Sequence, residues 1–184
     1  MFTTDRLTLR AWREGDDNNM LLLYNNPLVA PYITFDYIIP QTPKYKAELN
    51  ELAANAIMFC IIEEKESNNY VGVVGFINKP NPKNQIGGFM LGLLPEFWRK
   101  GYGEEATRFM VDYGFHSLGL HRISMVVFEG NDRAMALYQR VGFKIEGTAK
   151  RCLWMDGRWH DVYYTAILED EWAELKKSGI TSNQ

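Results

Sequence analysis

The chain has 184 residues, of which 46% are hydrophobic and 23% charged, and its formal net charge at pH 7 is −3. This length fits one domain of an ordinary globular protein, and the charge balance gives no reason to expect nucleic acid. No apolar run approaches the roughly 20 residues needed to cross a bilayer, and the start lacks a signal-peptide core. With only Cys60 and Cys152 as cysteines, the sequence predicts a cytoplasmic protein without a membrane or nucleic-acid partner.

The first half of the chain predicts strands and helices in alternation. Leu7 and Leu9 alternate with polar neighbours, which predicts a strand with one buried face over residues 7–11. A helix over residues 16–24 is followed by a proline-rich loop and a second helix over residues 45–54. Two strands come next, over residues 58–63 and 70–79, separated by the turn-prone Glu66-Ser67-Asn68-Asn69.

The second half predicts a parallel crossover followed by a hairpin. A strand over residues 86–93 leads through a helix over residues 102–118 to a strand over residues 122–128. The remaining elements are a helix over residues 132–141, two strands joined by the Asp156-Gly157 turn, and a helix over residues 170–177. This order predicts an α/β or α+β domain built on one mixed sheet.

An anion-binding pattern follows the strand over residues 86–93. The sequence LGLLPEFWRKGYGEEA places Arg99 and Lys100 directly before Gly101 and Gly103, at the start of a helical pattern. Glycines let the backbone turn sharply, so that successive N–H groups at a helix start converge on phosphate oxygens. The helix dipole and the two cations add positive charge at the same end. The loop therefore predicts a site for a phosphorylated cofactor.

The loop alone leaves two other interpretations open. It is compatible with an ordinary turn before a helix, in which both cations are solvated. Residues 101–106 also match G-x-G-x-x-G/A, the fingerprint of a dinucleotide-binding oxidoreductase. That fingerprint belongs to a βαβ repeat, whereas here Pro95 lies between strand and glycines and no second nucleotide-binding half follows. A P-loop is excluded because no Gly-Lys-Ser/Thr occurs.

A second motif gives the loop its context. The segment EGNDRAMALYQRVGF resembles the N-x-x-A/S-x-x-x-Y/L-x-x-x-G-F pattern of the GNAT superfamily of acyl-CoA-dependent N-acyltransferases, whose phosphate loop has the form Q/R-x-x-G-x-G/A. The matching residues are Asn131, Ala134, Tyr138, Gly142 and Phe143. The opening TDRLTLR and the late DGRWHD look like the RimJ/RimL-like branch, which acetylates ribosomal proteins. The resemblance spans nearly the whole chain and implies a single GNAT domain over residues 1–184.

This resemblance implies a fold and a cosubstrate. The expected sheet has about seven strands, mostly antiparallel, with helices on both faces, and its fourth and fifth strands, residues 86–93 and 122–128, splay apart. Acetyl-CoA would enter this wedge, and no metal is expected. The implied cofactor-binding residues are Leu91, Gly92 and Leu93 through their backbone, Arg99, Lys100, Gly101, Tyr102, Gly103 and Glu104 around the pyrophosphate, and Asn131. Asn131 is also a plausible helix N-cap, and the two roles are compatible.

Tyr138 is the candidate general acid. The leaving group is a thiolate with a pKa of about 8.5, and a phenol with a pKa of about 10 stays protonated at neutral pH, so that it can donate a hydrogen bond throughout the reaction. The competing interpretation makes Tyr138 an amphipathic helix residue that packs beside Leu137 and Val141. The motif favours the catalytic role.

The chain departs from the family pattern in two places. Trp98 stands where many members carry Gln or Arg, although Trp is familiar in the RimJ/RimL-like branch. Gly87 and Gly88 stand where related strands often carry a carboxylate, so the general base is unassigned. Glu129, two residues before Asn131, is the nearest carboxylate in sequence, but its position favours a solvated side chain at the end of a strand.

The acceptor groove of such an enzyme would be covered by the proline-rich segment and the late hairpin. Aromatic residues gather in both, namely Tyr32, Phe35 and Tyr37 beside Asp36 in the first, and Trp154 and Trp159 beside His160 in the second. They suggest an amine held by aromatic rings and a carboxylate. Loop anchoring by buried aromatics is the alternative.

The sequence as a whole predicts an N-acetyltransferase that moves an acetyl group from acetyl-CoA to a primary amine by direct attack in a ternary complex. The acceptor is a protein N-terminus or a small amine, and the protein is a monomer or homodimer. One alternative is a non-catalytic acyl-CoA-binding sensor or interaction module with a GNAT fold, which the missing base would favour. The other is the nucleotide-dependent oxidoreductase.

Overall fold

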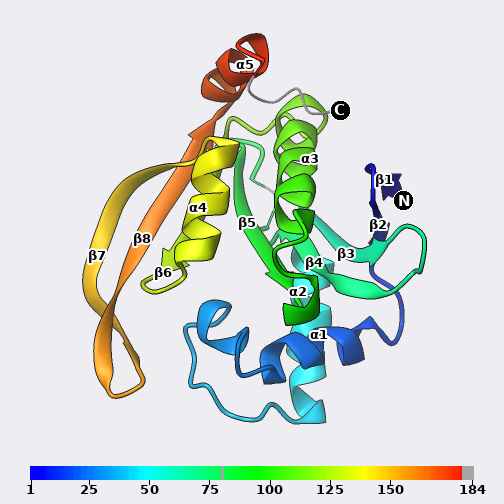
Figure 1. Cartoon of the computed structure of the whole chain (residues 1–184), viewed down its shortest axis with the longest axis vertical. Coiled ribbons are helices and arrows are strands. Elements are labelled where there is room, and N and C mark those ends of the chain that lie inside the picture. The colour runs from blue at the N-terminus through cyan, green and yellow to red at the C-terminus, as the bar shows by residue number, and fades with distance from the viewer. Residues whose placement is uncertain (80, 180–184) are drawn as a thin grey trace.

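A computed structural model describes residues 1–79 and 81–179 of the chain. Its strands form an eight-stranded sheet in the order β1-β2-β3-β4-β5-β6-β8-β7 (Figure 1). The strands are β1 (Phe2–Thr3), β2 (Leu7–Ala11), β3 (Met58–Glu64), β4 (Tyr70–Phe76), β5 (Ile86–Leu93), β6 (Arg122–Phe128), β7 (Lys144–Met155) and β8 (Arg158–Leu168). The sheet is mostly antiparallel, as predicted, and has one strand more than the expected seven. The extra strand, β1, is too short to show an alternation of apolar and polar residues.

The helices cover both faces of the sheet. They are α1 (Asp16–Asn25), α2 (Lys46–Asn55), α3 (Tyr102–His116), α4 (Asp132–Val141) and α5 (Glu169–Lys177), with short 3-10 turns at Ala30–Tyr32, Pro43–Tyr45 and Pro95–Phe97. Leu23 of α1 packs at Gly92, whereas Gly103 of α3 lies against Leu91 and Leu93. Neighbouring strand residues face opposite sides, so α1 and α3 lie on opposite faces. Figure 1 shows α3 and α4 side by side in front of the strands. Within the described ranges, no helix has the length and apolar character of a membrane span.

A buried ion network ties the start of α1 to the sheet. Arg10 on β2 donates two hydrogen bonds to Asp16, at 2.7 and 2.9 Å, and a third to Glu63 on β3 at 2.7 Å. Asp16 also accepts the backbone N–H of Arg13 at 2.7 Å. Burial opposes ionisation of Asp16, but the hydrogen bonds from Arg10 and Arg13 outweigh it, so the pKa of this carboxyl lies below its usual value. The carboxylate therefore contributes stability that is present at neutral pH and is lost as the pH falls through the lowered pKa.

We expect Asp16→Ala to destabilise the protein by about 3–5 kcal/mol at pH 7, because it leaves the Arg10 guanidinium buried with one partner fewer. Urea unfolding at pH 7 and at about pH 3, below the ordinary pKa of an aspartate, measures this effect, and the difference from wild type should shrink at the lower pH. Asp17→Ala is the matched control in the same helical turn, since Asp17 accepts only an exposed hydrogen bond from Asn50. Equal losses in the two variants would contradict the assignment.

The sheet opens between β5 and β6. These parallel strands pair only where Ile86, Gly87 and Gly88 lie beside Arg122, Ile123 and Ser124. Beyond Gly88, β5 stays paired with β4 through Leu93, and β6 stays paired with β8 through Phe128. The two strands therefore diverge from Phe89 and Met125 onward. The predicted parallel crossover and the predicted splay are both confirmed.

Candidate active site

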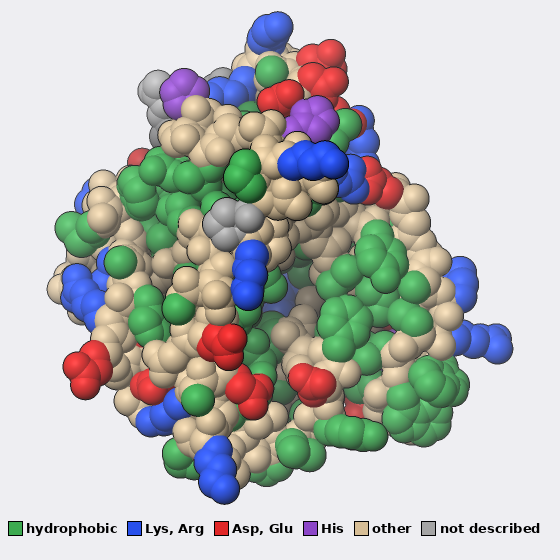
Figure 2. Space-filling view, turned by 180° about the vertical axis from the view of Figure 1, so that it is seen from behind, with side chains coloured by type: hydrophobic (Ala, Val, Ile, Leu, Met, Phe, Trp, Pro, Cys, Tyr) green, Lys and Arg blue, Asp and Glu red, His purple; other side chains and the backbone are tan. Residues whose placement is uncertain are grey.

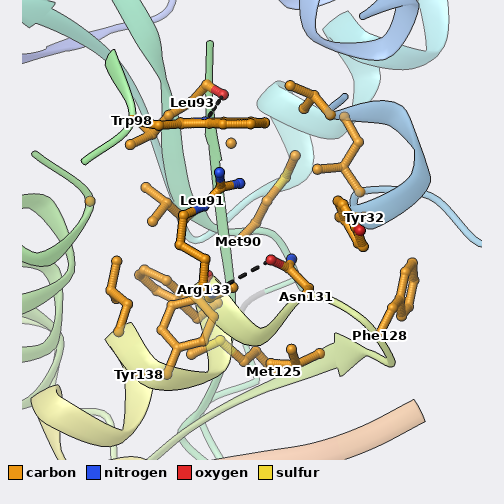
Figure 3. Close-up of a pocket in the computed structure, with 18 of the residues that line it drawn as sticks. Tyr32, Met90, Leu91, Leu93, Trp98, Met125, Phe128, Asn131, Arg133 and Tyr138 are labelled. Carbon is orange, nitrogen blue, oxygen red and sulfur yellow. Dashed lines mark hydrogen bonds between the residues drawn. The ribbon is translucent and has the colours of Figure 1, made fainter. Parts of the chain in front are cut away.

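A cavity of about 530 Å³ fills the wedge between β5 and β6. Its walls come from these two strands, the loop before α3 and the start of that helix, α4, and the segment after α1 (Figure 3). The sequence-predicted residues that line it are Leu91, Gly92, Leu93, Arg99, Gly101, Tyr102, Gly103, Glu104, Asn131 and Tyr138. In Figure 3, Trp98 lies at one end of the view and Tyr138 at the other.

The free edge of β5 presents backbone groups to this cavity. The N–H of Ile77 donates to the carbonyl of Gly88, and the N–H of Leu94 donates to that of Val71. Because backbone groups alternate along a strand, Gly92 directs its N–H and carbonyl to β4, and Leu91 and Leu93 direct theirs to the cavity. The Leu93 carbonyl already accepts the indole N–H of Trp98 at 2.8 Å. Leu91 is therefore the residue of this trio with both backbone groups free for an added strand-like ligand.

The start of α3 has the geometry of an anion site. Arg99 and Gly101 adopt positive φ angles of 61° and 82°, which turn the chain sharply into the helix. In the described part of the chain, the N–H groups of Tyr102, Gly103 and Glu104 have no acceptor, since the first helical bond runs from Glu105 to Gly101. These donors and the helix dipole point to an anionic ligand at this end of the wedge. The site fits the phosphates of acetyl-CoA.

The charged side chains of this loop divide between the cavity and the protein surface. Arg99 lines the cavity, but Lys100 does not. The Lys100 ammonium lies 3.8 Å from Glu64 and 4.8 Å from the centre of the Phe97 ring. The Glu104 carboxylate is paired with Arg108 and Arg140. The Lys100 side chain therefore contacts the outside of the loop, whereas the sequence predicted that it contacts the pyrophosphate. Glu104 can contact a ligand only through its free backbone N–H, because its carboxylate is paired.

An ion-pair clamp fixes this loop from the N-terminal segment. The Glu105 carboxylate accepts the Thr4 hydroxyl at 2.5 Å and both the backbone N–H and the Nε of Arg6 at 2.8 Å. Arg6 also donates to the carbonyl of Lys100 at 2.8 Å. Sequence reasoning singled out the TDRLTLR segment but assigned it no role. The contacts show that it holds the anion-binding turn in place.

Tyr138 lies on α4 with its ring buried beside the wedge. Its side chain is 7% exposed and contacts the rings of Phe89 and Phe143, with centroid distances of 6.1 and 5.8 Å. No hydrogen bond joins its hydroxyl to any described residue, although the side chain lines the cavity. Burial raises the pKa of the phenol above its ordinary value, so the group is protonated at neutral pH. The position of Tyr138 is therefore compatible with both interpretations from the sequence. The ring packs in the core, and the hydroxyl is able to donate a hydrogen bond into the cavity.

Asn131 begins α4 and faces the cavity. Its side-chain oxygen accepts the N–H of Ala134 at 3.3 Å, which confirms the N-cap geometry expected from the sequence. The side-chain amide nitrogen has no partner in the described ranges and lies in the wedge (Figure 3). The cap and a contact to a ligand carbonyl can therefore coexist.

Among the residues that the structure describes, no carboxylate takes the place of the missing general base. A Cβ at Gly87 would lie 2.7 Å from the Leu120 side chain and 2.9 Å from the Phe76 ring, so any larger residue there would have to displace these side chains. The N–H of Gly88 donates to Asn78, whose side chain also binds the carbonyl of Ile86. Glu129 accepts the N–H of Asp161 and the guanidinium of Arg158 and is not among the lining residues. Of the described residues that line the cavity, Glu104 is the only acidic one.

The side of the cavity away from the phosphate loop is apolar and aromatic. Tyr32 and Phe35 line it, and Phe35 packs edge-on against Phe128 with a centroid distance of 4.7 Å. Tyr37 is 84% exposed and neither it nor Asp36 lines the cavity. The hairpin aromatics Trp154 and Trp159 pack on each other at the surface, and His160 is buried and bonded to the carbonyl of Met155. Across the described residues, no three His, Cys, Asp or Glu side chains are grouped to hold a metal ion.

A parallel crossover, a splayed sheet and an anion site at the start of α3 define a protein that binds a phosphorylated cosubstrate along a strand edge. Residues 6–144 match the family model described as an acetyltransferase (GNAT) domain. The chain belongs to this family and is an enzyme that transfers an acetyl group from acetyl-CoA to an amine.

Several relatives are similar along most of the chain. Spermidine N-acetyltransferase from Vibrio cholerae, solved in complex with CoA and spermine, is 30% identical with a TM-score of 0.80 and covers 92% of this chain and 99% of that one. The uncharacterized N-acetyltransferase p20 of Bacillus licheniformis is 33% identical over 92% of this chain and 97% of its own length. The putative ribosomal N-acetyltransferase YdaF of Bacillus subtilis is 26% identical over 94% and 98%.

Proposed function

We propose that this enzyme acetylates the N-terminal amine of a protein, as the RimJ/RimL-like branch does, with Tyr138 as its general acid. The observation that carries the acceptor class is the absence of acidic residues from the acceptor side of the cavity, among the described residues.

The cosubstrate lies along the wedge. The backbone of Leu91 pairs with the pantetheine arm like an added strand, and Asn131 contacts it from α4. Gly92 and Leu93 form the wall beside it. The pyrophosphate sits at the N–H groups of Tyr102, Gly103 and Glu104, with Arg99 beside them, while Lys100 and Gly101 give the turn its shape. The free donors at the start of α3 support this placement.

Acetyl transfer proceeds by direct attack in a ternary complex. The amine nitrogen forms a bond to the thioester carbonyl carbon, the carbon–sulfur bond breaks, and the electron pair leaves on sulfur. Tyr138 donates a hydrogen bond to the developing thiolate and then supplies its proton, which returns from water. The amine attacks in its neutral form, after loss of any ammonium proton to water, and the nitrogen gives up one further N–H proton to water once the new bond has formed. Water takes these protons because the described lining residues offer no free carboxylate as a base. Cys60 is buried, Cys152 is exposed, and neither lines the cavity, so no thiol is placed to form an acyl-enzyme.

The acceptor side suits an amine on a weakly charged body. Its lining residues are Tyr24, Leu28, Val29, Tyr32, Ile33, Phe35, Met90, Met125 and Phe128. A polyamine carries several ammonium groups, and each one that loses water without an anionic partner costs several kcal/mol, of order 2–5. Glu104, the single acidic residue among the described lining residues, is already paired with two arginines. A peptide N-terminus presents one amine and an uncharged backbone.

The exposed surface around the hairpin extends this apolar character. Figure 2 shows apolar side chains gathered over β7 and β8, beside a hollow in the middle of that face. The exposed ones include Ile145, Trp154, Trp159 and Tyr164. Such a surface fits a polypeptide acceptor better than a small, highly charged amine.

A panel of acceptors tests the proposed function. We expect thiol release from acetyl-CoA with short peptides that have a free, uncharged N-terminal residue, and kcat/KM for spermidine at least about tenfold lower, in line with one unpaired buried ammonium. The same peptides with a blocked N-terminus and an internal lysine are the control for side-chain acetylation. If the enzyme turned over spermidine in preference to the peptides, the proposed acceptor would be wrong. A polyamine, the acceptor that the likeness to the Vibrio cholerae enzyme favours, would take its place.

We also propose that residues 1–184 form one GNAT domain, which the single sheet of the described strands supports. A cytoplasmic location is supported by the two free cysteines. We propose a monomer or homodimer, whereas the Vibrio cholerae spermidine N-acetyltransferase has a dodecameric structure. Light scattering of the purified protein distinguishes these states.

A further inference from the structure

Two arginines that line the cavity have no anionic partner. In the described residues, Arg99 and Arg133 form neither a salt bridge nor a side-chain hydrogen bond, while the neighbouring Arg140 is paired with Glu104 at 3.0 Å. Burial and the charge of Arg99 lower the pKa of Arg133. Both residues are exposed, and two close cations of the same sign repel each other, so this arrangement favours a bound anion between them.

Trp98 holds the Arg133 side chain over the wedge. The centre of the Arg133 guanidinium lies 3.4 Å from the centre of the Trp98 ring. The ring itself is fixed by the hydrogen bond from its indole N–H to the carbonyl of Leu93. Figure 3 shows the guanidinium beneath the ring and directed into the cavity. This cation–π contact joins α4 to the loop that carries Arg99, so it places the second cation beside the first.

We propose that Arg133 binds the pyrophosphate of acetyl-CoA opposite Arg99 and the start of α3, and that Trp98 positions its guanidinium for this contact. The inference rests on the placement of acetyl-CoA under the proposed function. The pyrophosphate carries one negative charge on each phosphate, which matches the two unpaired arginines. A planar guanidinium donates two parallel hydrogen bonds to phosphate oxygens, and the flat face left free by this geometry stacks on the indole.

Calorimetric titration with CoA tests the proposal without any need for an acceptor. We expect Arg133→Gln to raise the Kd for CoA about 10- to 100-fold, the range of a charge-assisted hydrogen bond. Dephospho-CoA, which keeps the pyrophosphate and lacks the 3′-phosphate, should show the same fold-change, whereas pantetheine should show none. Arg151→Gln removes the same charge from β7, outside the cavity, and should leave all three values unchanged.

A double-mutant cycle separates positioning by Trp98 from a general effect on the fold. We expect Trp98→Leu alone to weaken CoA binding about 3- to 10-fold, and to have little further effect once Arg133 is Gln. With a turnover assay, both single variants should raise the KM for acetyl-CoA and leave kcat within about twofold. Additive losses would show that Trp98 does not act through Arg133 and would overturn the positioning role.

Three results with the Arg133→Gln variant would overturn the binding role of Arg133. They are an unchanged Kd for CoA, an equal loss with pantetheine, and a loss confined to CoA and absent with dephospho-CoA, which would assign Arg133 to the 3′-phosphate. Failure of wild type to bind CoA would also overturn it. Normal CoA binding without turnover of any peptide would instead contradict the proposed function and leave this result standing.

Discussion

Replacement of Tyr138 by phenylalanine is expected to lower kcat about 10²- to 10⁴-fold with little change in the KM for acetyl-CoA. The substitution keeps the ring contacts with Phe89 and Phe143 and removes only the hydroxyl, so the thiolate would leave without a donor. Thiol release at saturating acetyl-CoA measures the effect. Because burial raises the pKa of this phenol, the wild-type enzyme should not lose activity through ionisation of Tyr138 as the pH rises from 7 to about 9.

A second tyrosine, half-buried with a buried hydroxyl, provides the matched control. The Tyr70 hydroxyl is buried without a hydrogen-bond partner in the described residues, and its side chain does not line the cavity. Tyr70→Phe should therefore keep wild-type kcat. If Tyr138→Phe kept full activity as well, Tyr138 would be a packing residue only, and the thiolate would have to be protonated by water.

The next largest effect is expected from Gly101→Glu, which should weaken acetyl-CoA binding more than about 100-fold. A side chain at φ 82° is strained, and its Cβ would lie 3.0 Å from Nη2 of Arg6, in the clamp that holds the turn. The carboxylate would also add negative charge where we propose that the two phosphates bind, and repulsion between unit charges about 4 Å apart amounts to about 4 kcal/mol at an effective dielectric of about 20. Calorimetric titration with acetyl-CoA measures the loss.

Gly119→Glu is the control that distinguishes the effect of backbone strain from the effect of blocking the anion site. Gly119 has a similar φ of 64° in the turn after α3, and a Cβ there would meet no atom within 4 Å. Both variants carry the same added charge and a comparable strain, but only Gly101 lies at the wedge. Comparable losses of acetyl-CoA affinity in the two variants would refute the placement of the pyrophosphate at α3.

Much of the fold follows from local patterns in the sequence. The alternation of apolar and polar residues predicted β2, and the helical spacing of apolar residues predicted α3, each beginning at the correct residue. The Asp156-Gly157 turn predicted the hairpin of β7 and β8. The splay of β5 and β6 came from the family resemblance and not from periodicity. The two-residue strand β1 has too few residues to carry a pattern.

The site was less predictable, because the orientation of its groups depends on register and on distant contacts. The sequence grouped Gly92 with Leu91, but the β4–β5 register directs the backbone of Gly92 away from the wedge. Lys100 looked equivalent to Arg99, but the positive φ of Arg99 and the carboxylate of Glu64 separate the two side chains. The pairing of Arg6 with Glu105 joins residues 99 positions apart, which no local motif could reveal.

The most direct test of the account is a set of initial velocities with acetyl-CoA and a peptide amine varied together. One cavity holds the anion site, Tyr138 and the acceptor side, and neither cysteine lines it. Direct transfer therefore predicts double-reciprocal lines that intersect, since both substrates must be bound before the thiol is released. Parallel lines, with a burst of thiol in the absence of amine, would indicate a covalent acyl-enzyme and would contradict the account.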